Sequence, residues 1–204
     1  MIAYNAFDCS LKSIQRENFS SMKNLKILRL NNNKIETISV EVFDDLKSLE
    51  MLNLDDNKIR WMHENSFRNL GKLEWLWLEG NQLTSLYPEV FEGLKNLRIL
   101  LMNRNLLKSL DIHQFSKNLK LEKIQLQKNK IESLSEKIFD NLNELKEVDL
   151  RGNQCIDQQY GFWLGGKLFL DVFDEDFKED VIANCTINEK WGLLYDVTKN
   201  MTTV

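Results

Sequence analysis

The residues of this chain that could carry out covalent or metal chemistry are few and widely separated. There are three cysteines, Cys9, Cys155 and Cys185, and two histidines, His63 and His113. A catalytic cysteine needs a base beside it, and both histidines lie far along the chain from Cys9. No nucleophile–base pair, paired carboxylates or metal-ligand cluster is visible, so we expect no catalytic residues, no metal site and no cofactor.

An acidic run near the C-terminus is the one candidate for calcium binding. Calcium loops need a turn-forming glycine and closely alternating oxygen ligands, and the run has neither. Residues 155–204 carry nine acidic and four basic side chains, whereas residues 1–154 carry 22 acidic and 23 basic side chains. We therefore interpret the run as a solvated acidic face. Its members are Asp171, Asp174, Glu175, Asp176, Glu179 and Asp180.

Two tryptophans stand out as candidates for a binding surface. The stretch LEWLWLEGNQL, residues 73–83, alternates as a half-buried strand does. If Leu76 and Leu78 point into a core, Trp75 and Trp77 point toward water. Large aromatic side chains displayed together are typical of a surface that contacts a partner.

The element that must position these tryptophans is a repeat of constant length. Leucines recur every 24 residues without insertion or deletion, an asparagine recurs eight residues after each of them, and a phenylalanine follows later in most units. The leucines are Leu25, Leu49, Leu73, Leu97, Leu121 and Leu145; the asparagines are Asn33, Asn57, Asn81, Asn105, Asn129 and Asn153; the phenylalanines are Phe43, Phe67, Phe91, Phe115 and Phe139.

Each unit matches L-x-x-L-x-L-x-x-N-x-L and resembles the leucine-rich repeat family, in its 24-residue, phenylalanine-containing extracellular type. The resemblance covers residues 1 to about 155. It implies an α/β solenoid of horseshoe shape, in which the short strands stack into a parallel concave sheet. We expect residues 1–154 to form about seven repeats, the first one truncated, and residues 155–204 to form a C-terminal cap and tail. The asparagines should hydrogen-bond to backbone groups where the chain leaves each strand, and the phenylalanines should fill the convex half.

The start of the chain falls inside a repeat. Counting back 24 residues places Cys9 at the asparagine position, where the family also accepts cysteine, so we expect a buried core thiol. We also expect a fragment of a longer protein, because nothing polar covers the first coil. A second irregularity lies at FSKNLKL, where we expect Leu119 rather than residue 118 to supply the inward apolar side chain.

The end of the repeats resembles the short C-terminal cap of insect extracellular leucine-rich-repeat proteins. The stretch GNQCID contains Cys155, and Cys185 follows 30 residues later. The resemblance implies a disulfide between them, which would contribute roughly 3–4 kcal/mol through chain entropy. The alternative is two reduced core thiols.

Three N-x-S/T triplets favour an extracellular location. They begin at Asn18, Asn184 and Asn200, and each is a candidate glycosylation site. Together with the cysteine pair and the repeat type, they indicate a secreted or cell-surface glycoprotein. No apolar run approaches the roughly 18 residues of a membrane span, so any membrane attachment would use segments missing from this chain.

Stacking the repeats in register predicts which side chains share the concave face. The third positions of successive units are Ala3, Ile27, Met51, Trp75, Ile99, Lys123 and Glu147; the fifth are Asn5, Arg29, Asn53, Trp77, Leu101, Gln125 and Asp149. The central members Met51, Trp75, Trp77, Ile99 and Leu101 form an apolar patch, called here the concave patch, of a size that monomers seldom expose without purpose. Charged residues flank it: Asp55, Asp56 and Glu79 on one side, Arg104, Lys128 and Arg151 on the other.

We interpret the chain as a non-enzymatic extracellular recognition module whose concave face binds a protein ligand or co-receptor. Its contact residues would be the concave patch with Arg29, Glu79 and Arg104. By resemblance, such proteins serve in insect immunity, adhesion or development. The alternative is a structural or matrix scaffold that self-associates through the concave face, as a homodimer would. Scattered surface apolar residues without a role are a further reading. The net charge of -4 does not favour nucleic acid.

Overall fold

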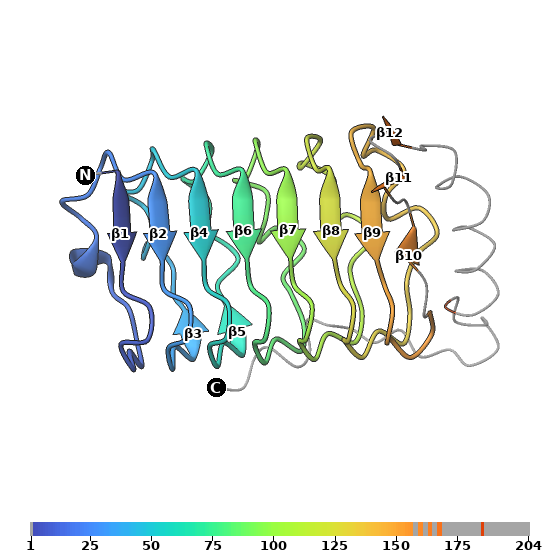
Figure 1. Ribbon diagram of the computed structural model, residues 1–204, viewed down its shortest axis with the longest axis horizontal. Helices are drawn as coiled ribbons and strands as arrows, with labels where there is room; N and C mark the ends of the chain where they lie inside the picture. The colour runs from blue at the N-terminus through green and yellow to red at the C-terminus, as the bar shows by residue number, and fades with distance from the viewer. Residues whose placement is uncertain (1, 157–158, 161–162, 165–166, 169–184, 186–204) are drawn as a thin grey trace.

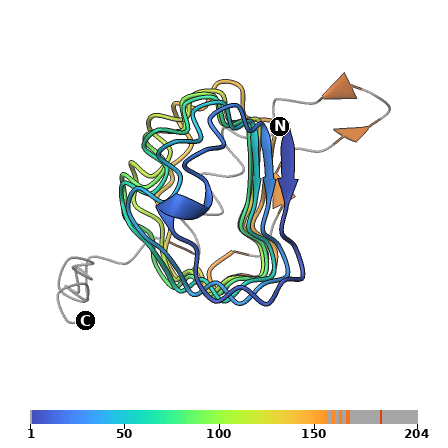
Figure 2. The ribbon, with the colours of Figure 1, turned by 90° about the vertical axis from the view of Figure 1, so that its left-hand side faces the viewer.

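One long parallel sheet forms a wall of a coiled chain in the computed structural model, which describes residues 2–156, 159–160, 163–164, 167–168 and 185. Figure 1 shows the strands side by side, and Figure 2 shows the coils end on, with the sheet along one wall. The parallel strands are β1 (Ala3–Asn5), β2 (Ile27–Arg29), β4 (Met51–Asn53), β6 (Trp75–Trp77), β7 (Ile99–Leu101), β8 (Lys123–Gln125) and β9 (Glu147–Asp149). Each begins 24 residues after the one before it, so the predicted solenoid with a parallel sheet is confirmed.

The remaining elements are short. Strand β10 (Gln159–Tyr160) pairs antiparallel with β9, and β11 (Trp163–Leu164) pairs antiparallel with β12 (Lys167–Leu168). Away from the main sheet, β3 (Thr37–Ile38) and β5 (Trp61–Met62) pair in parallel. The wall opposite the sheet consists mainly of turns, and the one helix among the described residues is the 3-10 helix η1 (Arg16–Asn18).

Alternation along each strand explains why these short segments form a sheet. The middle residue of each inner strand points inward and is fully buried, as are the apolar residues two positions later. A strand buries alternate side chains on one face, so three residues per coil suffice when neighbouring coils supply the rest of the core. The middle residues are Leu28, Leu52, Leu76, Leu100, Ile124 and Val148.

The predicted phenylalanine spine fills the far half of the coils. Six rings, from Phe19 to Phe139, follow one another at centroid distances of 6.0 to 6.5 Å. Four of the five neighbouring pairs are stacked with interplanar angles of 16° or less. These large side chains are buried in the half of the coils opposite the sheet, and the contacts between neighbouring rings add to the stabilisation from their burial.

The asparagine ladder joins each coil to the coil before it. The Oδ1 of Asn105 accepts a hydrogen bond from the Leu83 amide at 3.1 Å. Its Nδ2 donates to the carbonyl oxygens of Leu78 at 2.9 Å and Met102 at 3.1 Å. The Met102 oxygen also accepts from Asn129, so this carbonyl is shared by the asparagines of two coils. The expected role of these residues at the turn is confirmed.

Cys9 corrects the expectation of a core thiol, because its side chain is exposed. The ladder explains why. Each asparagine acts on the preceding coil, and among the described residues none precedes the coil of Cys9. Its backbone amide instead donates to Asn33 in the following coil, and its thiol donates to the Phe7 carbonyl oxygen at 3.2 Å.

The expectation for Leu119 is also wrong. Asn118 occupies the inward position and is 1% exposed, whereas Leu119 is 55% exposed. The Nδ2 of Asn118 donates to the carbonyl oxygens of Phe91 and Leu94 at 2.9 and 3.0 Å, which offsets the cost of burying its NH₂ group, whereas its Oδ1 is buried without a partner among the described residues. The regular 24-residue geometry therefore prevails over the local preference for an apolar side chain.

The disulfide expected from the cap resemblance is present. Cys155 and Cys185 are joined, with their Cα atoms 4.9 Å apart. Both cysteines pack against the end of the core, and Cys185 is buried. The bond ties the last coil to a residue 30 positions later.

Replacing Asn105 by leucine should lower the free energy of unfolding by about 2–4 kcal/mol. The Leu83 amide loses its partner inside the core, while the carbonyls of Leu78 and Met102 each keep one bond from a neighbouring asparagine. Chemical denaturation of both proteins measures the difference. Asn143→Leu is the control, because Asn143 is exposed and makes no side-chain hydrogen bond among the described residues. Equal stability of the two variants would contradict the role of the ladder.

Candidate ligand-binding site on the concave sheet

The two predicted columns of side chains are present in the sheet. Met51 aligns with Trp75 and Trp75 with Ile99, while Trp77 aligns with Leu101. Adjacent strands of a sheet lie about 4.8 Å apart, so aligned side chains are close neighbours. The register thus brings together all five residues of the concave patch on β4, β6 and β7.

The side chains of the concave patch are partly buried rather than fully exposed. All five have intermediate exposure, and the indole Nε1 of Trp77 is buried without a hydrogen-bond partner. Large side chains on neighbouring strands shield one another, an effect that alternation within a single strand does not predict. Next to them, in the column formed by the fifth repeat positions, Asn53 is buried, and its Oδ1 accepts a hydrogen bond from the Asp55 amide at 2.8 Å. The patch is therefore a packed apolar surface with one unsatisfied donor.

Charged residues follow the strands at the lower edge of the sheet in Figure 1. The Arg104 guanidinium donates to Glu79 and to Asp56, each at 2.8 Å, and so joins three coils. Of the predicted flanks, Asp56 and Glu79 therefore meet Arg104 in one ion-pair network, which among the described residues does not include Lys128 or Arg151. Arg29, at the fifth position of its repeat, donates a hydrogen bond to the Asn5 side chain at 3.1 Å and lies apart from this network.

The turn after each of these strands contains a residue in the left-handed backbone conformation. Asp56, Gly80, Arg104 and Lys128 share one repeat position and have φ values between 50° and 66°. A side chain at Gly80 would collide with the Asp56 carboxylate and crowd the Arg104 guanidinium. Glycine is favoured here for its conformation, and it also leaves room for the ion pair.

The carboxyl of Asp55 is the most perturbed titratable group in this region. Burial raises its pKa to about 7, and the nearby carboxylates of Glu79 and Asp56 add to the rise. The backbone amide of Glu79, which donates to Asp55 Oδ1 at 2.7 Å, and the charge of Arg104 act in the opposite direction. Desolvation disfavours the charged form, so Asp55 holds a proton up to neutral pH.

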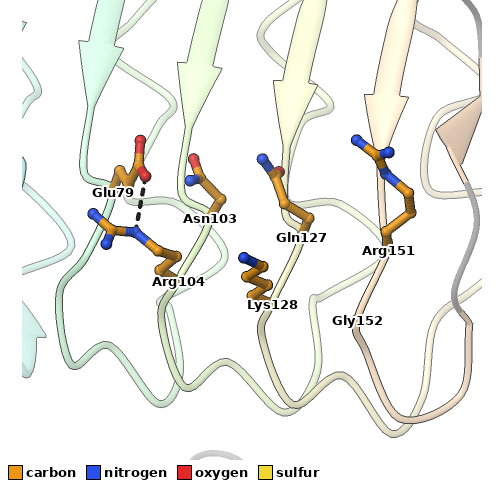
Figure 3. A pocket seen from close by; sticks show the side chains of 7 residues that line it. All are labelled: Glu79, Asn103, Arg104, Gln127, Lys128, Arg151 and Gly152. Carbon is orange, nitrogen blue, oxygen red and sulfur yellow. Dashed lines mark hydrogen bonds and ion pairs between the residues drawn. The ribbon is translucent and has the colours of Figure 1, made fainter.

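A cavity of about 480 Å³ lies beside the ion-pair network. Figure 3 shows its polar lining, with the Lys128 ammonium pointing toward the space between Asn103 and Gln127. The Arg151 guanidinium also lines it and is paired with the Asp149 carboxylate at 2.7 Å. The lining residues are Glu79, Asn103, Arg104, Gln127, Lys128, Arg151 and Gly152. We did not predict a cavity from the sequence; reading the seventh repeat position as a third column would have grouped four of these residues.

The other candidates lie away from the sheet. Asn18 is exposed, and its Oδ1 accepts from the Gln15 amide at 2.8 Å, so its use as a glycosylation site stays a prediction. His63 packs edge-on against Trp61, with ring centroids 5.8 Å apart. His113 is exposed in a later coil. Among the described residues, no group of three or more metal-ligating side chains comes together.

Several predicted features lie outside the described residues. These are the acidic run from Asp171 to Asp180 and the glycosylation candidates Asn184 and Asn200. In the part of the chain that the structure describes, no helix is long and apolar enough to cross a membrane.

Replacing Asp55 by asparagine should remove a pH dependence of stability. The folded state raises the pKa of Asp55, so the wild-type protein loses stability as the pH rises from about 4 to about 7. Asn31 and Asn103 occupy the same repeat position in other coils, so the fold accommodates asparagine there. An asparagine at position 55 can still accept a hydrogen bond from the Glu79 amide. Thermal unfolding should show equal melting temperatures near pH 4 and a more stable variant near pH 8.

The control for this comparison is Glu36→Gln, which removes an exposed carboxylate that has no ion pair among the described residues. Its melting profile should run parallel to that of the wild type. A parallel profile for Asp55→Asn as well would show that folding does not raise the pKa of Asp55.

Comparison with known proteins supports the same architecture. A solved structure titled as the crystal structure of a TLR13–ssRNA13 complex superposes with a TM-score of 0.71 at 29% sequence identity, covering 76% of this chain. The chain spans only 23% of that protein. No curated protein sequence matches. The family model described as leucine rich repeat matches three times, over residues 8–59, 54–107 and 95–154. Because these matches span most of the sequence, the chain belongs to the leucine-rich repeat family.

Proposed function

We propose that this chain is a non-enzymatic, extracellular recognition module that binds a protein ligand on its concave sheet. The observation that carries the proposal is the concave patch. Five large apolar side chains lie on three neighbouring strands, and all remain partly exposed. Interface centres are rich in aromatic residues and Met, and are bordered by polar rims. Residues 1–154 form the recognition unit in this proposal, and residues 155–204 close its end.

Rigid presentation makes the concave patch suitable for binding. Trp75 and Trp77 project from a sheet whose inward side chains are fully buried, so little ordering is needed when a partner covers them. The buried Nε1 of Trp77 lacks a partner, and an acceptor group on a ligand would satisfy it. Arg29, Glu79 and Arg104 border the patch as polar contacts.

The disulfide and the exposed Asn18 support an extracellular location. The structural neighbour is named for a complex with RNA. We favour a protein ligand here because the centre of the site is apolar, and because the Arg104 and Arg151 guanidinium groups beside it are already paired with carboxylates.

Truncating either tryptophan should weaken binding by about 2 kcal/mol or more while leaving the fold intact. The probes are peptides selected on the immobilised wild-type protein from a random-peptide display library, since such selections favour energetic hot spots. Their affinities for Trp75→Ala and Trp77→Ala are measured by calorimetry. Trp61→Ala is the matched control, because Trp61 is an exposed tryptophan on β5, away from the concave sheet.

Selected peptides that bind all variants equally, or that respond only to Trp61→Ala, would contradict the proposal. Two further measurements separate the alternatives. A homodimer in sedimentation equilibrium that Trp77→Ala dissociates would favour the self-associating scaffold. Tryptophan-dependent binding of a single-stranded RNA oligonucleotide would replace the protein ligand by nucleic acid.

A further inference from the structure

The polar cavity below the concave patch has the features of a site for a single carboxylate. We propose that it binds one Asp or Glu side chain of the partner, two residues along an extended segment from an apolar side chain seated on the concave patch. This inference rests on the proposed function and specifies the chemistry of the partner. Three observations carry it: one unpaired ammonium, two unpartnered amides and the spacing from the patch.

Lys128 supplies the only side-chain charge in the cavity lining that has no counter-ion among the described residues. Arg104 is neutralised by Glu79 and Asp56, and Arg151 is bound to Asp149. Lys128 lies at a left-handed turn with a φ of 57°, and Figure 3 shows its ammonium directed toward the space between Asn103 and Gln127. A single unpaired ammonium calls for one monovalent anion.

Two amides complete the site. Both Asn103 and Gln127 line the cavity, and neither side chain makes a hydrogen bond among the described residues. Their oxygens are buried, and a carboxylate only accepts hydrogen bonds, so the contacts to the ligand come from the NH₂ groups. Each NH₂ group can donate to one oxygen of the same carboxylate while Lys128 balances its charge.

The surroundings select a carboxylate over a polyanion. The carboxylates of Asp56, Glu79 and Asp149 lie in the ion pairs that border the cavity. Because both arginines are already paired, a ligand with repeated phosphate or sulfate groups would find one cation without a counter-ion in the described part of the chain, whereas one monovalent group needs only Lys128. The cavity is thus matched to an isolated acidic side chain.

The spacing to the concave patch defines the segment. Asn103 follows Leu101 by two residues on the same strand path, and Glu79 follows Trp77 in the same way. Two residues of extended chain span roughly 7 Å. A partner segment in extended conformation has the same spacing between alternate side chains. An apolar residue on Trp77 and Leu101 therefore places a residue two positions away at the cavity.

The test uses two matched peptides, acetyl-Leu-Ser-Glu-amide and acetyl-Leu-Ser-Gln-amide, and the protein with ¹³C-methylated lysines. Titration followed by NMR reports Lys128 directly, and the tryptophan indole signals report the concave patch. The glutamate peptide should bind roughly three- to tenfold more tightly, and this preference should shrink as salt is added. It should shift the Lys128 methyl signals, whereas the glutamine peptide shifts only the indoles.

Lys128→Met should abolish the preference for glutamate without changing the affinity for the glutamine peptide. Lys130→Met is the matched control, because Lys130 is an exposed lysine two residues away that lies outside the cavity lining. Asn103→Asp should reverse the preference by placing a carboxylate where the ligand's own would lie. Residues of acidic character at the same repeat position, Asp55 and Glu79, indicate that the fold accepts this change.

The outcomes separate this inference from the proposed function. Equal binding of both peptides, with indole shifts but no Lys128 shift, overturns the carboxylate site and leaves the concave patch as a binding surface. A Lys128 shift with both glutamate peptide and free acetate, without any indole shift, overturns the coupling between cavity and patch. Persistence of the glutamate preference in Lys128→Met also overturns the proposal.

Discussion

The hydrogen bonds of the asparagine ladder are the constraint on which the rest of this structure depends. Each buried asparagine connects the turn after one strand to the backbone of the coil before it, and carbonyls such as that of Leu54 accept from two successive asparagines. A slip of one residue between coils would break these bonds and also turn apolar side chains to the surface. The ladder therefore fixes the register with which all seven parallel strands align.

That register creates the candidate site. It aligns Trp75 with Met51 and Ile99, and it places the turn residues Asp56 and Arg104 close enough to share an ion pair although they are 48 positions apart in the sequence. The apolar part of the concave face and its charged edge are thus two bands of one lattice, separated by two residues along each strand. A ligand that covers both bands would contact apolar side chains held in place by the packed core and charged side chains held in place by ion pairs.

The sequence was sufficient to predict the solenoid and the aligned columns, because a constant 24-residue period leaves no freedom in alignment. The cysteine pairing followed instead from the resemblance of the repeat end to a short C-terminal cap. Sequence reasoning failed where neighbours in space decide the outcome. Cys9 is exposed since no coil precedes it among the described residues, and Asn118 is buried since carbonyls of the preceding coil accept hydrogen bonds from its NH₂ group. The partial burial of Trp77 and the cavity at Lys128 likewise arise from contacts between strands, which a pattern within one repeat does not contain.

The direction of the asparagine ladder has a consequence for how the chain is made. The amide of Ile59 is completed by Asn81, which lies 22 residues later, and the same offset recurs along the solenoid. During translation, each coil leaves the ribosome before the side chain that satisfies its turn. The turn of the newest coil therefore lacks its hydrogen-bond partner until the next repeat has been synthesised. The disulfide at Cys155 and Cys185 ends this succession, because it ties down the last coil by a covalent bond where no further asparagine follows in the repeat series.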